Sequence, residues 1–127
     1  MAGVVGVGAD VLEVARVARA HGRFGDRFLD RVYTAEERAF CLARADAACA
    51  LAGRFAAKEA VFKALSPAPP AALAFREIAI GGDGGRPVVK LSGGTAALAA
   101  RRGVKDVLVT ISHERAYAVA FAVALAE

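Results

Sequence analysis

The final stretch of the chain carries the pattern that most restricts how it can fold. From 116 to 126, alanine alternates strictly with Tyr, Val, Phe, Val and Leu, and a period of two is that of a β-strand. One face of this strand is therefore large and apolar, and the other is made of alanine alone. Because the alanine face carries no polar group, we expect it to be covered closely, by a helix or by another subunit.

The rest of the chain separates into helical and strand-like segments, which predicts an α+β fold in one domain, residues 1–127. Thr34 and Glu37 form a capping-box pattern, and the proline-rich segment 66–70 ends the longest helix. We expect a small antiparallel sheet, with two hairpins, packed on that long central helix. Besides the last strand, 116–126, the predicted strands are 4–9, 75–80, 87–91 and 104–112. Predicted helices are 11–19, 24–29, 35–44, 47–65 and one capped by Thr95.

Composition excludes several classes of protein. Apolar residues make up 57% of the chain, which excludes disorder, and no apolar run reaches the roughly 18 residues of a membrane span. No Lys or Arg precedes Asp10, and glycines interrupt the apolar start, so no secretory signal is predicted. Cys41 and Cys49 lack a metal-binding spacing, and we expect buried, reduced thiols in a cytoplasmic protein.

The chain has a net charge of +4, and four of its arginines follow one another at helical spacing. They are Arg16, Arg19, Arg23 and Arg27. If one helix runs that far, they form a single basic stripe, which is either a solvated helix face or a surface for an acidic partner. Nucleic acid is the less favoured partner, because no aromatic residues for base stacking interleave with these arginines.

The segment 6–10, Gly-Val-Gly-Ala-Asp, resembles the start of a dinucleotide-binding fingerprint. It fails as one, because Val11 stands where the third glycine is required. We interpret the glycines as allowing close backbone approach, with Asp10 at the end of a strand. Asp10 is then either a helix cap or a ligand.

The longest predicted helix carries a second carboxylate at a helical rim. In a helical projection, one face of this helix is apolar and is expected to face the core. This core stripe consists of Leu51, Phe55, Phe62 and Leu65. Glu59 lies beside that stripe, and Lys63 follows one turn later, so the two form either a structural ion pair or part of a site. In the second case Asp10 and Glu59 hold a hard cation. Two carboxylates suit Mg²⁺, which keeps waters and is completed by substrate phosphates.

A Ser-His-Glu run, residues 112–114, stands between the last two predicted strands. Neighbours on a strand point to opposite faces, so adjacency alone makes no catalytic triad of Ser112, His113 and Glu114. His113 is either a turn histidine bonded to backbone or a catalytic group at the mouth of the hairpin.

Four segments of the chain together resemble the sequence blocks of one known family. The segments are 6–17, 27–34 with Glu37, 52–65, and 110–113 with 117–120. The family is that of the holo-acyl-carrier-protein synthases, the small trimeric 4′-phosphopantetheinyl transferases. The third segment matches the central signature of that family almost residue for residue, and the resemblance runs essentially from end to end.

This resemblance implies both a reaction and roles for the residues above. A serine hydroxyl of apo acyl carrier protein attacks the β-phosphorus of coenzyme A, the 4′-phosphopantetheine arm is transferred, and adenosine 3′,5′-bisphosphate leaves, in fatty acid or polyketide biosynthesis. Asp10 and Glu59 match the family's Mg²⁺ ligands, and Lys63 is placed to stabilise the leaving phosphate. The serine proton is accepted by a metal-bound water or by the His113 and Glu114 pair.

The resemblance also implies binding partners. Arg54, Phe55, Lys63, Ser112 and His113 are expected to contact coenzyme A. The arginine stripe gains an acidic acyl carrier protein as its partner. A homotrimer is expected, with sites between subunits, and its formation would cover the alanine face of the last strand.

One segment departs from the family pattern. The family has a glycine-rich stretch after the long helix, whereas this chain reads Ser-Pro-Ala-Pro-Pro-Ala-Ala over 66–72. Proline has no backbone N–H to offer a phosphate. The alternative to an enzyme is a non-catalytic module that binds coenzyme A or acyl carrier protein. Retention of Asp10, Glu59, Lys63 and His113 together speaks against it, because a pure binder does not need all four.

Overall fold

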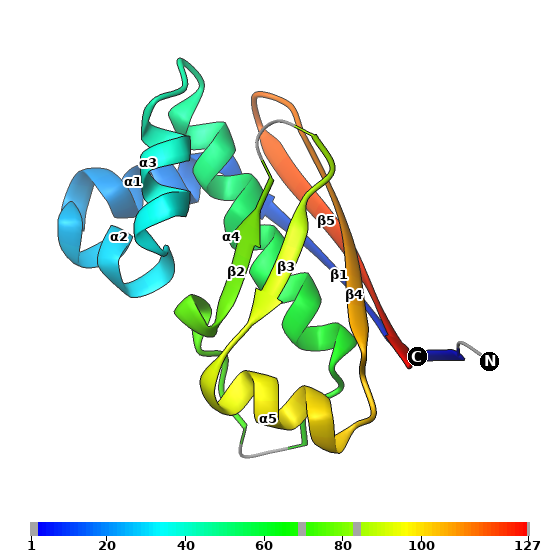
Figure 1. Ribbon diagram of the computed structural model, residues 1–127. Helices are drawn as coiled ribbons and strands as arrows, with labels where there is room; N and C mark the ends of the chain where they lie inside the picture. Colours follow the sequence, from blue (N-terminus) through cyan, green and yellow to red (C-terminus); the bar gives the residue numbers. More distant parts are fainter. Residues whose placement is uncertain (1–2, 69–70, 83–84, 127) are drawn as a thin grey trace.

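The computed structural model describes residues 3–68, 71–82 and 85–126. None of the helices in these ranges is long and apolar enough to span a bilayer. The elements run in the order expected of an α+β fold (Figure 1). They are β1 (Gly3–Glu13), α1 (Val14–Phe24), α2 (Asp26–Val32), α3 (Ala35–Leu42), α4 (Ala47–Ala64), the 3-10 turn η1 (Phe75–Glu77), β2 (Ile78–Gly81), β3 (Val88–Leu91), α5 (Gly93–Arg101), β4 (Asp106–His113) and β5 (Tyr117–Ala126).

The expected antiparallel strands packed on the long helix are confirmed, and they form two sheets. One sheet has the order β1-β5-β4, and the other is the β2-β3 hairpin. Helix α4 contacts all three strands of the first sheet and also β2, so it lies at the centre of the molecule, as expected from its length (Figure 1). Helices α1, α2 and α3 lie together at one end, and α1 and α3 pack on α4.

The alanine face of β5 packs against α4. Buried on that face are Ala118, Ala120, Ala122 and Ala124, and opposite them on α4 lie Ala56, Ala57, Ala60 and Ala64. With only methyl groups between them, the helix approaches the sheet closely. The expectation of a covering helix is confirmed. The expectation that a trimer covers this face is wrong, because α4 of the same chain already does so.

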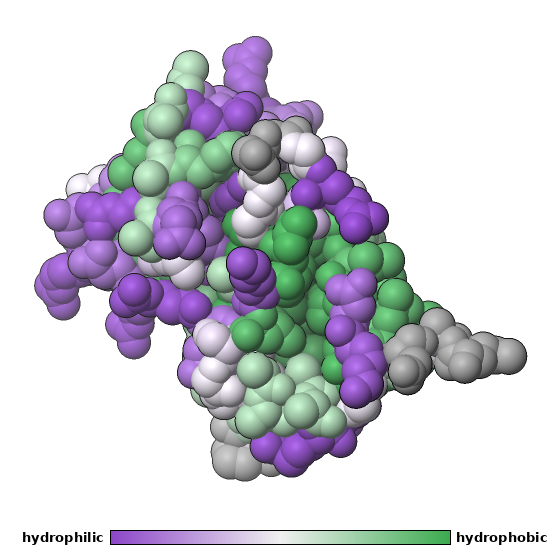
Figure 2. Space-filling model, in the orientation of Figure 1, coloured by the Kyte–Doolittle hydropathy of each residue, from purple (hydrophilic) through white to green (hydrophobic). Residues whose placement is uncertain are grey.

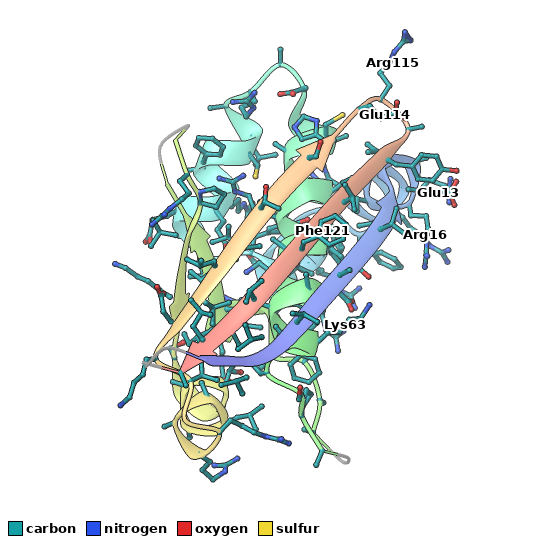
Figure 3. The ribbon with its side chains drawn as sticks, turned by 90° about the vertical axis from the view of Figure 1, so that its right-hand side faces the viewer. Glu13, Arg16, Lys63, Glu114, Arg115 and Phe121 are labelled. Carbon is teal, nitrogen blue, oxygen red and sulfur yellow. The ribbon has the colours of Figure 1, made fainter. Side chains whose placement is uncertain are left out.

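The other face of the sheet is the open one. It exposes large apolar side chains on all three strands, namely Val4, Val7, Val11, Leu108, Tyr117 and Phe121. Figure 3 looks onto this face, with Phe121 near its centre. In Figure 2, hydrophilic residues gather over α1 and α2, while hydrophobic residues follow the side where the three-stranded sheet lies. An exposed apolar patch that extends over three strands is typical of a surface that binds another molecule.

Two glycines of β1 permit an even closer approach to α4. A Cβ atom at Gly6 would stand 2.1 Å from the carbonyl oxygen of Ala64, and one at Gly8 would stand 2.0 Å from that of Ala60. Neither space admits a side chain. The interpretation of these glycines as sites of close backbone approach is confirmed.

Strand β1 is longer than predicted, and this changes the place of Asp10. Pairing with β5 continues to Glu13 opposite Tyr117, so α1 begins at Val14 rather than near residue 11. Asp10 therefore lies within the strand, opposite Ala120, and is neither at the strand end nor a helix cap. Tertiary pairing extended the strand beyond its local pattern.

The capping predictions had mixed outcomes. The capping box of Thr34 and Glu37 is confirmed at the start of α3. Thr95 is not the cap of α5, because Ser92 holds that position and Thr95 lies buried in the first turn. There its amide and its hydroxyl both donate to Glu77, whose carboxylate satisfies the start of the helix.

Helix α4 is buried on more faces than the predicted stripe. Leu51 and Leu65 are buried as expected, whereas Phe55 and Phe62 are only half-buried. The sheet, α1, α3 and β2 all contact this helix, so its interior positions are mostly alanine and valine rather than one row of large residues.

One fully buried position of α4 is a lysine. Lys58 forms an ion pair with Glu37 at 2.8 Å and donates to the carbonyl oxygens of Phe75 and Ile78. Glu37 also accepts from the amides of Thr34 and Ile80. Every charge in this network is therefore hydrogen-bonded, as burial requires, and the network ties α3, α4 and β2 together.

Candidate active site in two halves

Strand β1 and helix α4 bring three of the predicted site residues together. Asp10 projects from the inner face of β1 toward α4, and its carboxylate accepts a hydrogen bond from Lys63 at 3.2 Å. Lys63 also donates to the carbonyl oxygen of Ala9 at 3.0 Å. Glu59 stands one turn before Lys63 and lines, with Asp10, a cavity of about 300 Å³. Lys63 thus pairs with Asp10 and not with Glu59.

The electrostatics of this cavity favour a cation. Partial burial raises the pKa of Glu59, the negative charge of Asp10 raises it further, and Lys63 opposes both. Two carboxylates that repel each other in a partly dry site bind a positive charge well. Among the described residues, no three His, Cys, Asp or Glu side chains converge on one point. A pair of oxygen donors with room for water suits a hard divalent cation that keeps part of its hydration.

The same cavity extends away from the carboxylates along α1 and α2. Its wall is mostly apolar and includes Phe55, which packs on Phe75 with ring centroids 4.9 Å apart. Arg16 stands at its edge, and a second hollow adjoins it beside Phe24, Arg27 and Arg31. The surface next to the carboxylates is therefore both basic and apolar.

The predicted arginine stripe is not one helix face. Helix α1 ends at Phe24, because Gly25 adopts a left-handed φ of 55° that glycine accepts without strain. Arg16, Arg19 and Arg23 lie on α1, and Arg27 lies on α2. All four are exposed, so the basic surface spans two helices.

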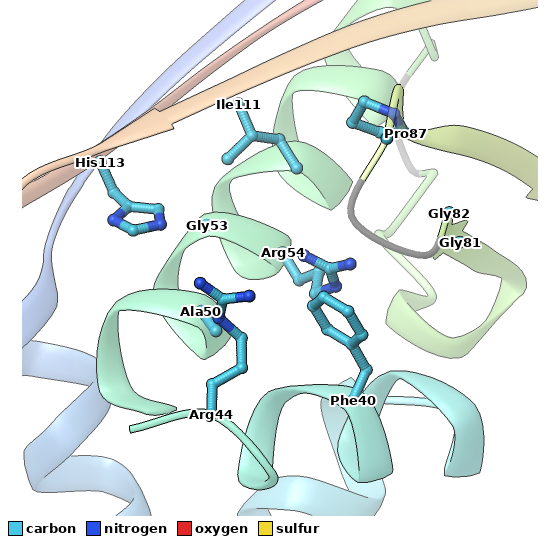
Figure 4. A pocket seen from close by; sticks show the side chains of 11 residues that line it. Phe40, Arg44, Ala50, Gly53, Arg54, Gly81, Gly82, Pro87, Ile111 and His113 are labelled. Atoms are coloured by element: carbon cyan, nitrogen blue, oxygen red, sulfur yellow. The ribbon is translucent and has the colours of Figure 1, made fainter. Parts of the chain in front are cut away.

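A second cavity, of about 180 Å³, gathers the other predicted residues. His113 enters it from the end of β4, and Arg54 enters from α4 (Figure 4). The guanidinium of Arg54 lies 4.3 Å from the ring centre of Phe40, and that of Arg44 lies 5.7 Å from the same ring. The Nε atom of Arg54 is buried without a hydrogen-bond partner among the described atoms. Two arginines and a histidine around one cavity suit an anion such as phosphate.

Arg44 and Phe40 were missed by the sequence analysis. They come from α3 and from the turn after it, and no local pattern links either one to His113. Only the packing of α3 on α4 brings them beside Arg54. The capping box that starts α3 was the one available signal, since it fixed where that helix begins.

The two cavities have no lining residue in common. Asp10 lies on β1 and His113 on β4, with β5 between them, and each strand spacing adds about 4.8 Å. Ser112 points to the outer face of the sheet, opposite to His113. Glu114 is exposed in the turn, where its carbonyl oxygen accepts from Cys49. Both cysteines are free, with Cys41 buried and Cys49 half-buried.

The proline-rich segment after α4 is described only in part, because residues 69 and 70 lie outside the described ranges. Ser66 adopts a left-handed φ of 50°, which turns the chain away from the helix axis. Its described residues, 66–68 and 71–72, line neither of the two cavities.

The sequence and the fold of this chain are similar to those of known proteins. Residues 6–122 match the sequence model of the 4′-phosphopantetheinyl transferase superfamily. A holo-[acyl-carrier-protein] synthase of Desulforudis audaxviator is 46% identical over 123 residues, which are 96% of this chain and 93% of that protein. The crystal structure of the holo-[acyl-carrier-protein] synthase of Neisseria meningitidis superposes with a TM-score of 0.84 at 32% identity, covering 96% of this chain and 98% of that one. That of Helicobacter pylori, solved in complex with coenzyme A, superposes with a TM-score of 0.79 at 29% identity, covering 93% and 98%.

Proposed function

The chain belongs to the 4′-phosphopantetheinyl transferase superfamily, and from that premise we propose how its residues carry out the transfer. The chain is an enzyme that catalyses the holo-acyl-carrier-protein synthase reaction, in which the 4′-phosphopantetheine arm of coenzyme A passes to a serine of apo acyl carrier protein. The observation that carries the residue assignment is that Asp10 and Glu59 line one cavity while Lys63 donates a hydrogen bond to Asp10.

In this proposal Asp10 and Glu59 hold Mg²⁺. When bound, the ion offsets negative charge that develops on the diphosphate oxygens as adenosine 3′,5′-bisphosphate leaves. Lys63 stabilises the same charge with its ammonium, since it stands one turn from Glu59 and contacts Asp10. His113 or Glu114 takes the proton of the attacking serine.

The second cavity holds the phosphate-bearing end of coenzyme A. Arg54 and His113 were expected to contact coenzyme A, and Arg44 adds a third positive or hydrogen-bonding group at the same place. Their side chains surround a hollow next to the ring of Phe40. Guanidinium groups match phosphate oxygens in two-point contacts, which gives this half of the site its selectivity.

The separation of the two halves supports an oligomer. Within one chain, Asp10 lies on one edge strand of the three-stranded sheet and His113 lies on the other. A homotrimer that packs the outer apolar face of the sheet would bring the β1 edge of one subunit beside the β4 edge of the next. This packing also covers Val7, Val11 and Phe121, which are otherwise left in water.

The acyl carrier protein docks on the basic surface beside the carboxylates. Four of its arginines were predicted, namely Arg16, Arg19, Arg23 and Arg27, and Arg31 joins them at the hollow beside Phe24. An acidic carrier is steered toward this surface, and the steering raises the association rate. We place the reaction in fatty acid or polyketide biosynthesis in the cytoplasm, where the two free thiols remain reduced.

The test of the reaction is intact-protein mass spectrometry of an apo acyl carrier protein incubated with this chain, coenzyme A and Mg²⁺. We expect the carrier to gain one phosphopantetheine, and we expect the gain to disappear with EDTA or with Asp10→Ala. A carrier whose acceptor serine is replaced by alanine is the control. Coenzyme A binding without transfer to any of several carriers would favour the binding-module alternative.

The test of the shared site is subunit complementation. Asp10→Ala and His113→Ala each disable a different half, so each variant alone is inactive. If the halves come from neighbouring subunits, a refolded mixture of the two variants regains part of the activity, because some interfaces then contain both intact halves. A mixture that stays inactive while each variant still assembles with its own kind would contradict a site built between subunits.

A further inference from the structure

The ammonium of Lys63 already contacts Asp10, one of the two proposed cation ligands. It donates to Asp10 at 3.2 Å and to the carbonyl oxygen of Ala9 at 3.0 Å. The Lys63 side chain is 51% exposed, whereas that of Asp10 is only 17% exposed and lines the cavity. The lysine is therefore the more solvent-exposed partner of this ion pair. Two contacts with β1 hold the ammonium there.

A divalent cation on Asp10 would compete with this ammonium. Mg²⁺ binds carboxylate oxygens at about 2.0–2.1 Å. Oδ1 of Asp10 lies 3.2 Å from the Lys63 nitrogen, so an ion on that oxygen would stand within roughly 5 Å of the ammonium in its present position. Like charges at such a distance repel strongly beside a partly buried carboxylate. A tightly bound metal therefore requires that Lys63 release Asp10 or lose most of its attraction to it.

We propose that Lys63 competes with the divalent cation for Asp10, and that metal binds tightly only after an anion at the diphosphate position has drawn the ammonium away. This inference rests on the proposed role of Asp10 and Glu59 as cation ligands. It adds a second task to Lys63, which is to make metal binding depend on coenzyme A.

The consequence is coupling between two ligands. If coenzyme A removes Lys63 from Asp10, it strengthens metal binding beyond what its own phosphate oxygens contribute, and metal strengthens coenzyme A binding by the same factor. Without substrate, the enzyme then holds little metal. Changing Lys63 to an uncharged residue removes this extra coupling and raises the metal affinity of the substrate-free protein.

Arg16 provides a matched control. It lines the same cavity as Asp10 and Glu59 and carries the same charge as Lys63. The ion pairs among the described residues join Asp10 to Lys63 and include none between Arg16 and Asp10. Removing Arg16 therefore removes one nearby positive charge without removing the competing contact.

The experiment measures Mn²⁺ binding by electron paramagnetic resonance of the full chain, first without coenzyme A. We expect Lys63→Met and Lys63→Gln to bind Mn²⁺ at least about 10-fold more tightly than the unaltered protein. Arg16→Met and Lys63→Arg are expected to stay within about 3-fold of it. With saturating coenzyme A, the affinity should rise by a larger factor in the unaltered protein than in Lys63→Met.

The possible failures are distinguishable. If both Lys63 variants bind Mn²⁺ no more tightly than the unaltered protein, or if Arg16→Met tightens binding as much as they do, the competition is wrong. The proposed function still stands in that case, provided that Asp10→Asn abolishes Mn²⁺ binding in the presence of coenzyme A. If Asp10→Asn and Glu59→Gln both bind Mn²⁺ normally under that condition, the assignment of the metal ligands is itself wrong.

Discussion

Lys58 and Lys63 lie on different faces of α4, and each forms an ion pair with a carboxylate from another element of the chain. The Lys58 pair is sealed inside the protein, with Glu37 on α3 as its partner. The Lys63 pair lies at the edge of a cavity, with Asp10 on β1 as its partner. The two pairs use the same chemical groups in opposite surroundings.

The surroundings decide what each pair does. Lys58 donates to Glu37 and to two carbonyl oxygens, so its ammonium is fully used and has no reason to move. Its burial lowers the pKa of the lysine, and Glu37 opposes that change. Lys63 is half exposed and exchanges partners at little cost. The buried pair joins α4 to α3, and on another face of α4 Lys63 contacts β1.

Breaking the buried pair should give the largest effect. Lys58→Met leaves the Glu37 charge buried without its cation, and we expect a loss of about 3–5 kcal/mol in unfolding free energy. This corresponds to a fall of roughly 10–20 °C in Tm, measured by thermal denaturation. The double variant Lys58→Met with Glu37→Gln should be more stable than Lys58→Met alone, since glutamine still accepts from Ile80 without a buried charge. A double variant that loses as much as the sum of the two singles would contradict this account.

Glu59→Gln should lower turnover strongly without lowering thermal stability, in contrast to Lys58→Met. Its turnover is expected to fall by about 1,000-fold, because one of the two metal ligands is lost. Its Tm should be unchanged or higher at pH 7. The pKa of Glu59 is raised in the folded protein, so near neutral pH the ionised form is less favourable folded than unfolded, and removing it relieves that cost. A clear fall in Tm would mean that Glu59 stabilises the fold.

Lys63→Met should lower turnover by a smaller amount, about 100-fold, since the metal remains. If Lys63 also competes for Asp10, the variant combines slower turnover with tighter metal binding. This combination separates a charge that acts on the substrate from one that merely supports the fold. Steady-state kinetics at saturating Mg²⁺ measure the turnover, and unaltered thermal stability is the control.

The smallest effect concerns the ionisation of Glu59. Asp10 raises the pKa of Glu59 and Lys63 lowers it. Asp10→Asn should therefore lower this pKa relative to the unaltered protein, and Lys63→Met should raise it. Carbon-13 NMR of the Glu59 side-chain carboxyl, followed as a function of pH without metal, measures both. Shifts in the same direction in both variants would mean that Glu59 does not sense these two charges as neighbours.

Local sequence patterns predicted the parts of the fold that depend on neighbours along the chain. The alternation in β5, the capping box at Thr34 and the rim position of Glu59 all follow from periodicity or short spacing. The burial of Lys58 did not, because a lysine is ordinarily exposed. Its partners Glu37, Phe75 and Ile78 are distant in sequence, and nothing near Lys58 indicates them.

The sequence predicted which residues belong to the candidate site better than it predicted how those residues are arranged in space. Family resemblance named Asp10, Glu59, Lys63 and His113, and the fold brings the first three together. It does not bring His113 to them, since β1 and β4 are opposite edges of one sheet. Sheet order depends on long-range pairing, which spacing along the chain does not determine.

The direct backbone contact between β1 and α4 limits which residues of this enzyme can be varied by mutation. Because the carbonyl oxygens of Ala60 and Ala64 fill the places where side chains at Gly8 and Gly6 would stand, a saturation library at these two positions should return almost nothing but glycine. Asp10 follows two residues after Gly8, so its reach to α4 depends on that gap remaining closed. Selection for new carrier specificity should therefore leave this strand untouched and accumulate changes on α1 and α2.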